Sequence, residues 1–137
     1  MRRITSLTTL TLALTLLVPI AASAKDICVQ SSLGETVIFR KVKRLKKPGQ
    51  VSPLHGIYIN GSAVAPISGT AVVRGNGSVM IAYFSHSMLT GVVNFTSTLI
   101  GTRDFTATGE FDNDGDYSSQ GISFSISPVS CKGISIP

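Results

Sequence analysis

The sequence predicts a single all-β domain, a small antiparallel up-and-down meander of about eight strands that is barrel-like and closed by a disulfide. Apolar and polar residues alternate with period two over several short segments, which Asn-Gly, Asp-Gly and Pro-Gly pairs separate. No segment after the first 24 residues combines helical periodicity with capping residues. The two cysteines, Cys28 and Cys131, lie near opposite ends of the remaining chain. A two-sheet β-sandwich is the alternative, because its strands have similar lengths and spacing.

Residues 1–24 have the pattern of a cleaved secretory signal peptide. Arg2 and Arg3 precede an apolar stretch from Leu7 to Ile20, and Ala22 to Ala24 forms an A-x-A cleavage signal. The stretch is shorter than the roughly 18 residues of a membrane-spanning helix and contains Pro19. We therefore expect export to the periplasm or the extracellular space, and no transmembrane span in the mature protein.

Residues 25–137 then form one domain. Because an exported protein meets an oxidising compartment, we expect Cys28 and Cys131 to be bonded rather than free or bound to a metal. Closing a loop of about 100 residues stabilises a fold by up to about 4.7 kcal/mol on the chain-entropy model. The bond also requires the first and last strands to be close, as they are in a closed barrel.

The strands are expected over short segments in chain order: 25–31, 35–42, 54–59, 69–74, 79–84, 92–100, 105–111 and 122–126. Pro66 predicts an edge, bend or bulge before residue 69, because proline cannot donate to a strand ladder. Hairpin turns are expected at Asn60-Gly61 and Asn76-Gly77.

The last hairpin has the clearest alternation. A two-residue turn at Asp114-Gly115 would pair Phe105 with Phe124 and Ala107 with Ile122, so that both apolar faces coincide.

The hairpin 69–84 is apolar on both faces. Ala71 to Val73 and Val79 to Phe84 are nearly uninterrupted apolar runs. Such strands are covered on both sides. This predicts either an external cover or a surface for homo-oligomer formation.

A basic segment is the strongest functional indication. Six cations fall within eight residues: Arg40, Lys41, Lys43, Arg44, Lys46 and Lys47. Such a cluster attracts polyanions such as anionic lipid or lipopolysaccharide. A solvated loop or a protected strand edge is the alternative. Nucleic acid is not favoured, because no aromatic residues interleave with the cations.

The acidic turn is a weak candidate for calcium. Asp112, Asp114 and Asp116 have the spacing that begins a calcium loop, but Tyr117 and Ser123 stand where such a loop needs Gly and Glu. A solvated turn is the favoured interpretation, and no metal or cofactor is expected.

The sequence does not indicate catalysis. His86 lies between two serines, but adjacent strand residues point to opposite faces. No glycine-rich phosphate loop or nucleophile elbow occurs. The strand number is similar to that of lipocalins and avidins, which use Trp at hallmark positions, and the chain has no Trp.

The sequence therefore predicts an exported, non-catalytic β-barrel binding protein that binds an anionic partner through residues 40–47 or a small ligand in the barrel. The alternative is a structural protein that self-associates through the hairpin 69–84.

Overall fold

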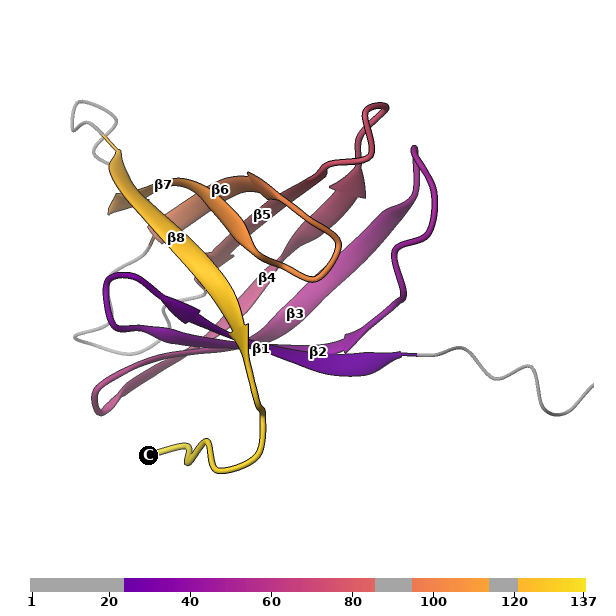
Figure 1. Ribbon diagram of the computed structural model, residues 1–137. Coiled ribbons are helices and arrows are strands. Elements are labelled where there is room, and N and C mark those ends of the chain that lie inside the picture. The colour runs from indigo at the N-terminus through magenta and orange to yellow at the C-terminus, as the bar shows by residue number, and fades with distance from the viewer. Residues whose placement is uncertain (1–23, 86–94, 114–120) are drawn as a thin grey trace, which may run out of the picture.

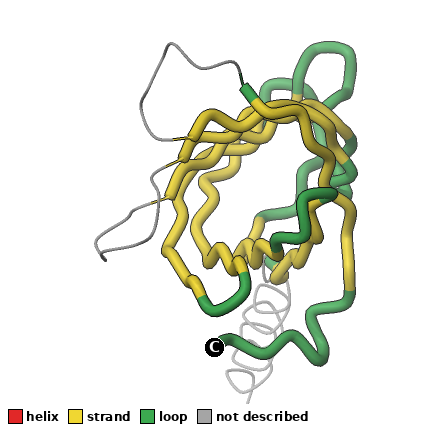
Figure 2. The backbone as a smooth tube through the Cα atoms, turned by 90° about the vertical axis from the view of Figure 1, so that its left-hand side faces the viewer, coloured by secondary structure: helices red, strands yellow, loops and turns green. Residues whose placement is uncertain are grey.

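The computed structural model describes residues 24–85, 95–113 and 121–137, which form a closed barrel of eight antiparallel strands. Each strand pairs with its neighbour in sequence, and β8 pairs with β1 to close the ring (Figures 1 and 2). The strands are β1 (Lys25–Ser31), β2 (Thr36–Val42), β3 (Val51–Asn60), β4 (Ala63–Val73), β5 (Val79–Ser85), β6 (Phe95–Gly101), β7 (Ala107–Asn113) and β8 (Ile122–Val129). The all-β meander and its barrel closure are confirmed.

Period-two alternation divides most strands into an inner and an outer face. The buried inner residues form one core cluster, which is rich in Val, Ile, Leu and Phe. The ring of Phe39 packs against Tyr83 at a centroid distance of 5.4 Å and against Phe105 at 5.2 Å. The ring of Phe95 lies 4.6 Å from that of Tyr58. Aromatic side chains therefore fill much of the barrel axis.

Two inward-facing glycines allow neighbouring strands to approach closely. A Cβ atom on Gly69 would lie 1.9 Å from the carbonyl oxygen of Ala82, and one on Gly109 would lie 2.0 Å from that of Thr98. Glycine at these positions lets the sheet curve tightly enough to close.

The disulfide joins Cys28 on β1 to Cys131, which follows β8, with a Cα–Cα distance of 5.3 Å. This confirms the predicted bond. On the outer face of β1 to β3, Cys28, Ile38 and Ile59 form a second apolar cluster, against which Ile57 and Ile134 pack. The C-terminal segment thus covers part of the outside of the barrel.

The predicted register of the last hairpin is wrong. Gly109, not Phe105, lies opposite Phe124, and Ala107 lies opposite Ile126. The pairing is displaced by four residues, and an even displacement keeps the same side chains on the inner face. Phe105 is fully buried but lies in the β6–β7 turn, with a φ of 72°. Asp114 and Gly115, the expected turn, lie outside the described residues.

The prediction that the strand starts at residue 69 is wrong, because β4 starts at Ala63 and is continuous through Pro66. Of the three alternatives for Pro66, the described pairing supports the edge position. Pro66 pairs with Ile57 of β3, whereas the pairing of β4 with β5 begins at Ile67. Proline is accepted because it lies beyond the end of the described β4–β5 ladder. The other hairpins form as expected. Asn60 pairs with Ala63, and Gly77 has the positive φ that its turn needs.

Candidate functional site

Three connections emerge at one end of the barrel because successive strands alternate in direction: β2–β3 (residues 43–50), β4–β5 (74–78) and β6–β7 (102–106) (Figure 1). The same end holds the start of β1. Its exposed cations are Lys25, Lys43, Arg44, Lys46, Lys47, Arg74 and Arg103. We call it the basic end. Glu35 and Asp112 lie at the opposite end, whose described turns contain no Lys or Arg.

The β2–β3 connection is held in place by its own side chains. Leu45 is buried among the core residues, whereas its neighbours Arg44 and Lys46 are exposed. The Oε1 atom of Gln50 accepts a hydrogen bond of 2.7 Å from the Lys46 amide, and its Nε2 atom donates one of 2.8 Å to the Arg44 carbonyl. The Gly49 amide donates to the Val73 carbonyl of β4. The basic segment is therefore anchored at several points.

The β6–β7 turn packs beside this connection. Arg103 Nη1 donates a hydrogen bond of 2.6 Å to the Lys46 carbonyl, which joins residues 57 positions apart. Asp104 accepts hydrogen bonds from the Thr102 hydroxyl and the Thr106 amide. These hydrogen bonds, first that from Thr102, lower the pKa of Asp104. The Asp104 carboxylate therefore stabilises its own turn.

A cleft of about 560 Å³ lies between the two connections and the start of β1. Its buried lining consists of Val42, Leu45 and Phe105, with Ile27 partly buried. Its exposed lining consists of Lys25, Lys43, Arg44, Arg103 and Asp104, a net charge of +3. The volume falls within the range of about 300–1,000 Å³ typical of ligand sites. An apolar base below a cationic margin suits a molecule with an anionic group and a hydrocarbon part.

The basic segment divides into three parts. Lys43 and Arg44 line the cleft, and Lys46 and Lys47 are exposed on the connection away from the cleft lining. Arg40 and Lys41 lie apart from both, in a β-bulge on β2.

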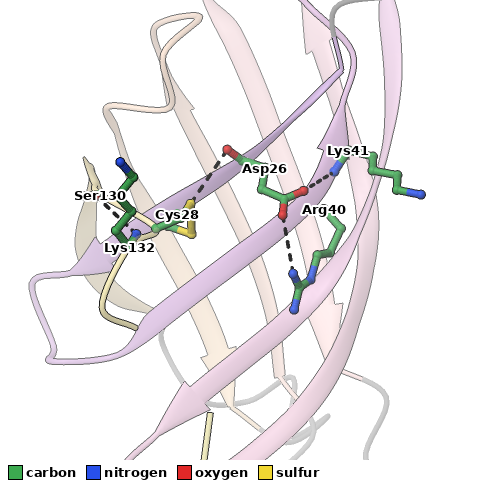
Figure 3. Close-up of a disulfide and its surroundings, with 7 residues drawn as sticks. Asp26, Cys28, Arg40, Lys41, Ser130 and Lys132 are labelled. Atoms are coloured by element: carbon green, nitrogen blue, oxygen red, sulfur yellow. Dashed lines mark hydrogen bonds and ion pairs between the residues drawn. A yellow bond between two sulfur atoms is a disulfide. The ribbon is translucent and has the colours of Figure 1, made fainter. Parts of the chain in front are cut away.

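The bulge places Arg40 and Lys41 opposite Asp26 (Figure 3). Lys41 has a φ of 49°, and its amide donates a hydrogen bond of 2.9 Å to Asp26 Oδ1. Arg40 Nη1 lies 3.4 Å from Asp26 Oδ2, in an exposed ion pair of a kind worth about 0–1 kcal/mol. The bulge also turns Val42 inward, so that it can line the cleft.

Sequence reasoning missed Lys25, Arg103 and the apolar base of the cleft. Lys25 reaches the basic segment because it pairs with Val42 in the β1–β2 ladder. Arg103, 57 positions from Lys46, reaches it because alternate connections of a meander share one end. Counting the predicted strands would have placed all three segments at the same end.

The opposite end of the interior contains a half-buried acid and hydroxyl groups. Burial raises the pKa of Glu35, although a hydrogen bond with Tyr58 opposes the rise. Burial, followed by the nearby charge of Glu35, raises the pKa of Tyr58 to about 12. Burial raises the pKa of Tyr83, whose hydroxyl is hydrogen-bonded with Ser97. Glu35 thus hydrogen-bonds with Tyr58, and Tyr83 with Ser97.

The other candidate residues stay largely untested. Asp112 is exposed at the end of β7, and Asp114 and Asp116 lie outside the described residues, as does His86. His55 is exposed on β3. Across residues 24–85, 95–113 and 121–137, no group of three or more His, Cys, Asp or Glu side chains could hold a metal ion.

The hairpin 69–84 contributes to an outer wall without formal charge. The outward-facing residues of β3 to β6 are Val51, Pro53, His55, Ile57, Ile59, Val64, Pro66, Ser68, Thr70, Val72, Met80, Ala82, Phe84, Thr96, Thr98 and Ile100. None of these is Asp, Glu, Lys or Arg. We call this surface the outer wall of β3–β6. In the part of the chain that the structure describes, no helix has the length and hydropathy needed to cross a membrane.

Comparison of the chain with protein-family models, curated protein sequences and solved structures gives no match.

Proposed function

We propose that this is an exported, non-catalytic binding protein that holds an anionic amphiphile in the cleft at its basic end. The observation that carries the proposal is the cleft itself, in which four cations from three separate segments surround a buried apolar base. A phosphate or carboxylate would meet Lys25, Lys43, Arg44 and Arg103. A hydrocarbon chain would contact Ile27, which is the partly exposed apolar residue of the lining, next to the edge of Leu45.

Both parts of such a ligand contribute to affinity. Burying apolar surface contributes roughly 25 cal/mol per Å². The cations supply attraction that salt screens, since they are exposed. Asp104 stays ionised, because hydrogen bonds to its Oδ1 atom, first that from Thr102, lower its pKa, and its charge offsets one of the four cations. The predicted signal peptide and the Cys28–Cys131 bond support export, because disulfides persist in oxidising compartments.

The test is isothermal titration calorimetry with dodecyl phosphate below its micelle concentration. Dodecylphosphocholine has the same chain and no net charge, and serves as the comparison ligand. We expect one dodecyl phosphate per protein and binding at least tenfold weaker for dodecylphosphocholine.

Two matched variants distinguish binding in the cleft from general attraction to the positive charge of the β2–β3 connection. Replacing Lys43 and Arg44 by Ser should weaken dodecyl phosphate binding at least tenfold. Replacing Lys46 and Lys47 by Ser removes the same charge outside the cleft lining and should weaken it less than threefold. Equal losses in the two variants, or none in either, would refute a cleft site.

A second candidate function is self-association through the outer wall of β3–β6. Phe84 is 42% exposed and lies beside a shallow depression lined by Thr70, Ala82 and Thr98. A projection next to a depression on one uncharged face can complement the same face of a second copy. Light scattering at tens of micromolar protein would show a dimer that a Phe84→Lys variant loses. A wild-type monomer at that concentration removes this candidate.

A further inference from the structure

One row of apolar side chains crosses the outer wall of β3–β6. Val51 pairs with Val72, Val72 with Met80, and Met80 with Ile100, so that the four are direct cross-strand neighbours on the outer face. Val51 is 56% exposed, Met80 37% and Ile100 45%. Three strand spacings make the row roughly 14 Å long. We call it the apolar row.

The apolar row lies at the basic end of the barrel. Val51 directly follows the β2–β3 connection, and Val72 lies two residues before Arg74. Ile100 lies three residues before Arg103. Lys46 and Lys47 extend from the connection that leads into Val51. Exposed apolar side chains therefore adjoin a margin of cations.

The surroundings of the apolar row lack acidic groups on the outer wall. The next row away from the basic end is Pro53, Thr70, Ala82 and Thr98, which carries no charge. Carboxylates begin on the outer face of β7, at Glu110 and Asp112. At the basic end, Asp26 is paired with Arg40, and Asp104 is bound within its own turn. Positive charge thus dominates beside the row.

We propose that the apolar row and the cations Lys46, Lys47 and Arg74 form a surface that docks onto an anionic lipid bilayer. Interfacial binding combines apolar side chains at the boundary between headgroups and acyl chains with cations near anionic headgroups. A soluble polyanion would use the cations and leave the row exposed to water. A second copy packed row against row in parallel would bring two basic ends together, and their repulsion disfavours that contact.

Docking through the apolar row and its neighbouring cations places the cleft near the same membrane. The cleft shares the basic end with the apolar row, since both border the β2–β3 and β6–β7 connections. The inference goes beyond the proposed function and does not depend on it, because the residues changed in its tests do not line the cleft.

The full chain is expressed, and the resulting protein is tested for flotation with vesicles of phosphatidylcholine that contain phosphatidylglycerol. Vesicles of phosphatidylcholine alone are the comparison. We expect binding that requires phosphatidylglycerol and falls at least tenfold when salt is raised from low to high concentration. Equal binding to both vesicles, or no binding to either, overturns the proposal.

The chain offers a matched pair of variants. Ile100 in the apolar row and Ile122 near the opposite end are each 45% exposed. Ile100→Ser should weaken vesicle binding five- to tenfold, whereas Ile122→Ser should leave it unchanged. Replacing Lys46 and Lys47 by Ser should also weaken vesicle binding at least tenfold. Dodecyl phosphate binding should be unchanged in the Ile100→Ser variant. Failure of the membrane-docking proposal is therefore distinguishable from failure of the proposed ligand binding in the cleft.

A single tryptophan reports directly on insertion, since the chain has no native Trp. Fluorescence of an Ile100→Trp variant should shift to the blue on addition of phosphatidylglycerol vesicles, and that of Ile122→Trp should not. A shift that appears without vesicles and grows with protein concentration would show that a second copy covers the row, which overturns the proposal. Shifts of equal size at both positions also overturn it.

Discussion

Alanine at position 69 tests the physical basis of the barrel's curvature. The added Cβ would lie 1.9 Å from the Ala82 carbonyl oxygen and 2.6 Å from the Tyr83 Cα atom, both of them backbone atoms of β5. Real Cβ atoms essentially never approach within 3.0 Å, so β4 and β5 must separate by about 1.1 Å, the difference between 3.0 and 1.9 Å. Overpacking costs about 1–3 kcal/mol, and each weakened ladder hydrogen bond about 1 kcal/mol.

We therefore expect Gly69→Ala to lower the free energy of unfolding by about 3 kcal/mol, after allowing about 0.5 kcal/mol for the reduced entropy of its unfolded chain. Urea unfolding followed by circular dichroism measures the change. With a slope of about 1–3 kcal/mol per molar, the urea midpoint should fall by roughly 1–3 M.

The control is Gly75→Ala. No atom lies within 4 Å of a Cβ built there, and the backbone is not in the left-handed region. This variant should stay within about 0.5 kcal/mol of the wild type. If Gly69→Ala unfolds at the same urea concentration as Gly75→Ala, the close approach of β4 and β5 does not limit the fold.

Three further changes have defined outcomes. Replacing Cys28 and Cys131 by Ala should lower the free energy of unfolding by about 4 kcal/mol in urea titrations, because the bond closes a loop across 103 positions. Burial raises the pKa of Glu35 above its ordinary value of 4.5, so the folded protein binds more protons than the unfolded chain at pH values just above 4.5. The wild type should therefore lose stability as the pH rises through the pKa of folded Glu35, and Glu35→Gln should remove this pH dependence. Urea titrations from about pH 4 to about pH 7 measure this slope. Leu45→Ala should cost about 2 kcal/mol and speed hydrogen exchange at the Lys46 amide, because Leu45 anchors the β2–β3 connection in the core.

Each change has a control. Reduced wild-type protein should match the double cysteine variant, and full stability after reduction would contradict the loop-closure argument. Tyr58→Phe removes a hydrogen bond that favours ionised Glu35, so the fall in stability with pH should become steeper; a flatter profile would contradict burial as the main cause. Leu33, which is 46% exposed, should tolerate Ala within about 0.5 kcal/mol. A loss at Leu45 no larger than that would show that the connection is not anchored there.

Much of the fold could be predicted because strand faces follow directly from period-two alternation. Phe95 and Leu99 are buried and Thr96 and Thr98 are exposed, as the pattern requires. The register of the last hairpin could not be predicted in this way. Moving Phe124 from Phe105 to Gly109 keeps it on the inner face, so the hydrophobic pattern does not distinguish the two pairings.

The position of the apolar hairpin 69–84 in the sheet also could not be predicted from its hydrophobic pattern. Its residues on one face are buried in the barrel, and those on the other form part of the outer wall. The sequence indicates that two faces are apolar. The apolar row itself depends on register, because Val51, Met80 and Ile100 become neighbours through three separate strand pairings.

Alternation of apolar and polar residues and the placement of the two cysteines are local or countable properties of the chain, and from them a β-meander with its two ends joined by a disulfide could be predicted. Cations are also concentrated in one segment of the sequence. Which of these cations lie together depends on how the strands pair in the folded barrel. The bulge at Lys41 directs Arg40 to Asp26, pairing of β1 with β2 brings Lys25 to Lys43, and the β6–β7 turn brings Arg103 to the same cleft. These contacts join segments far apart in sequence, and only the pairing of whole strands sets their positions.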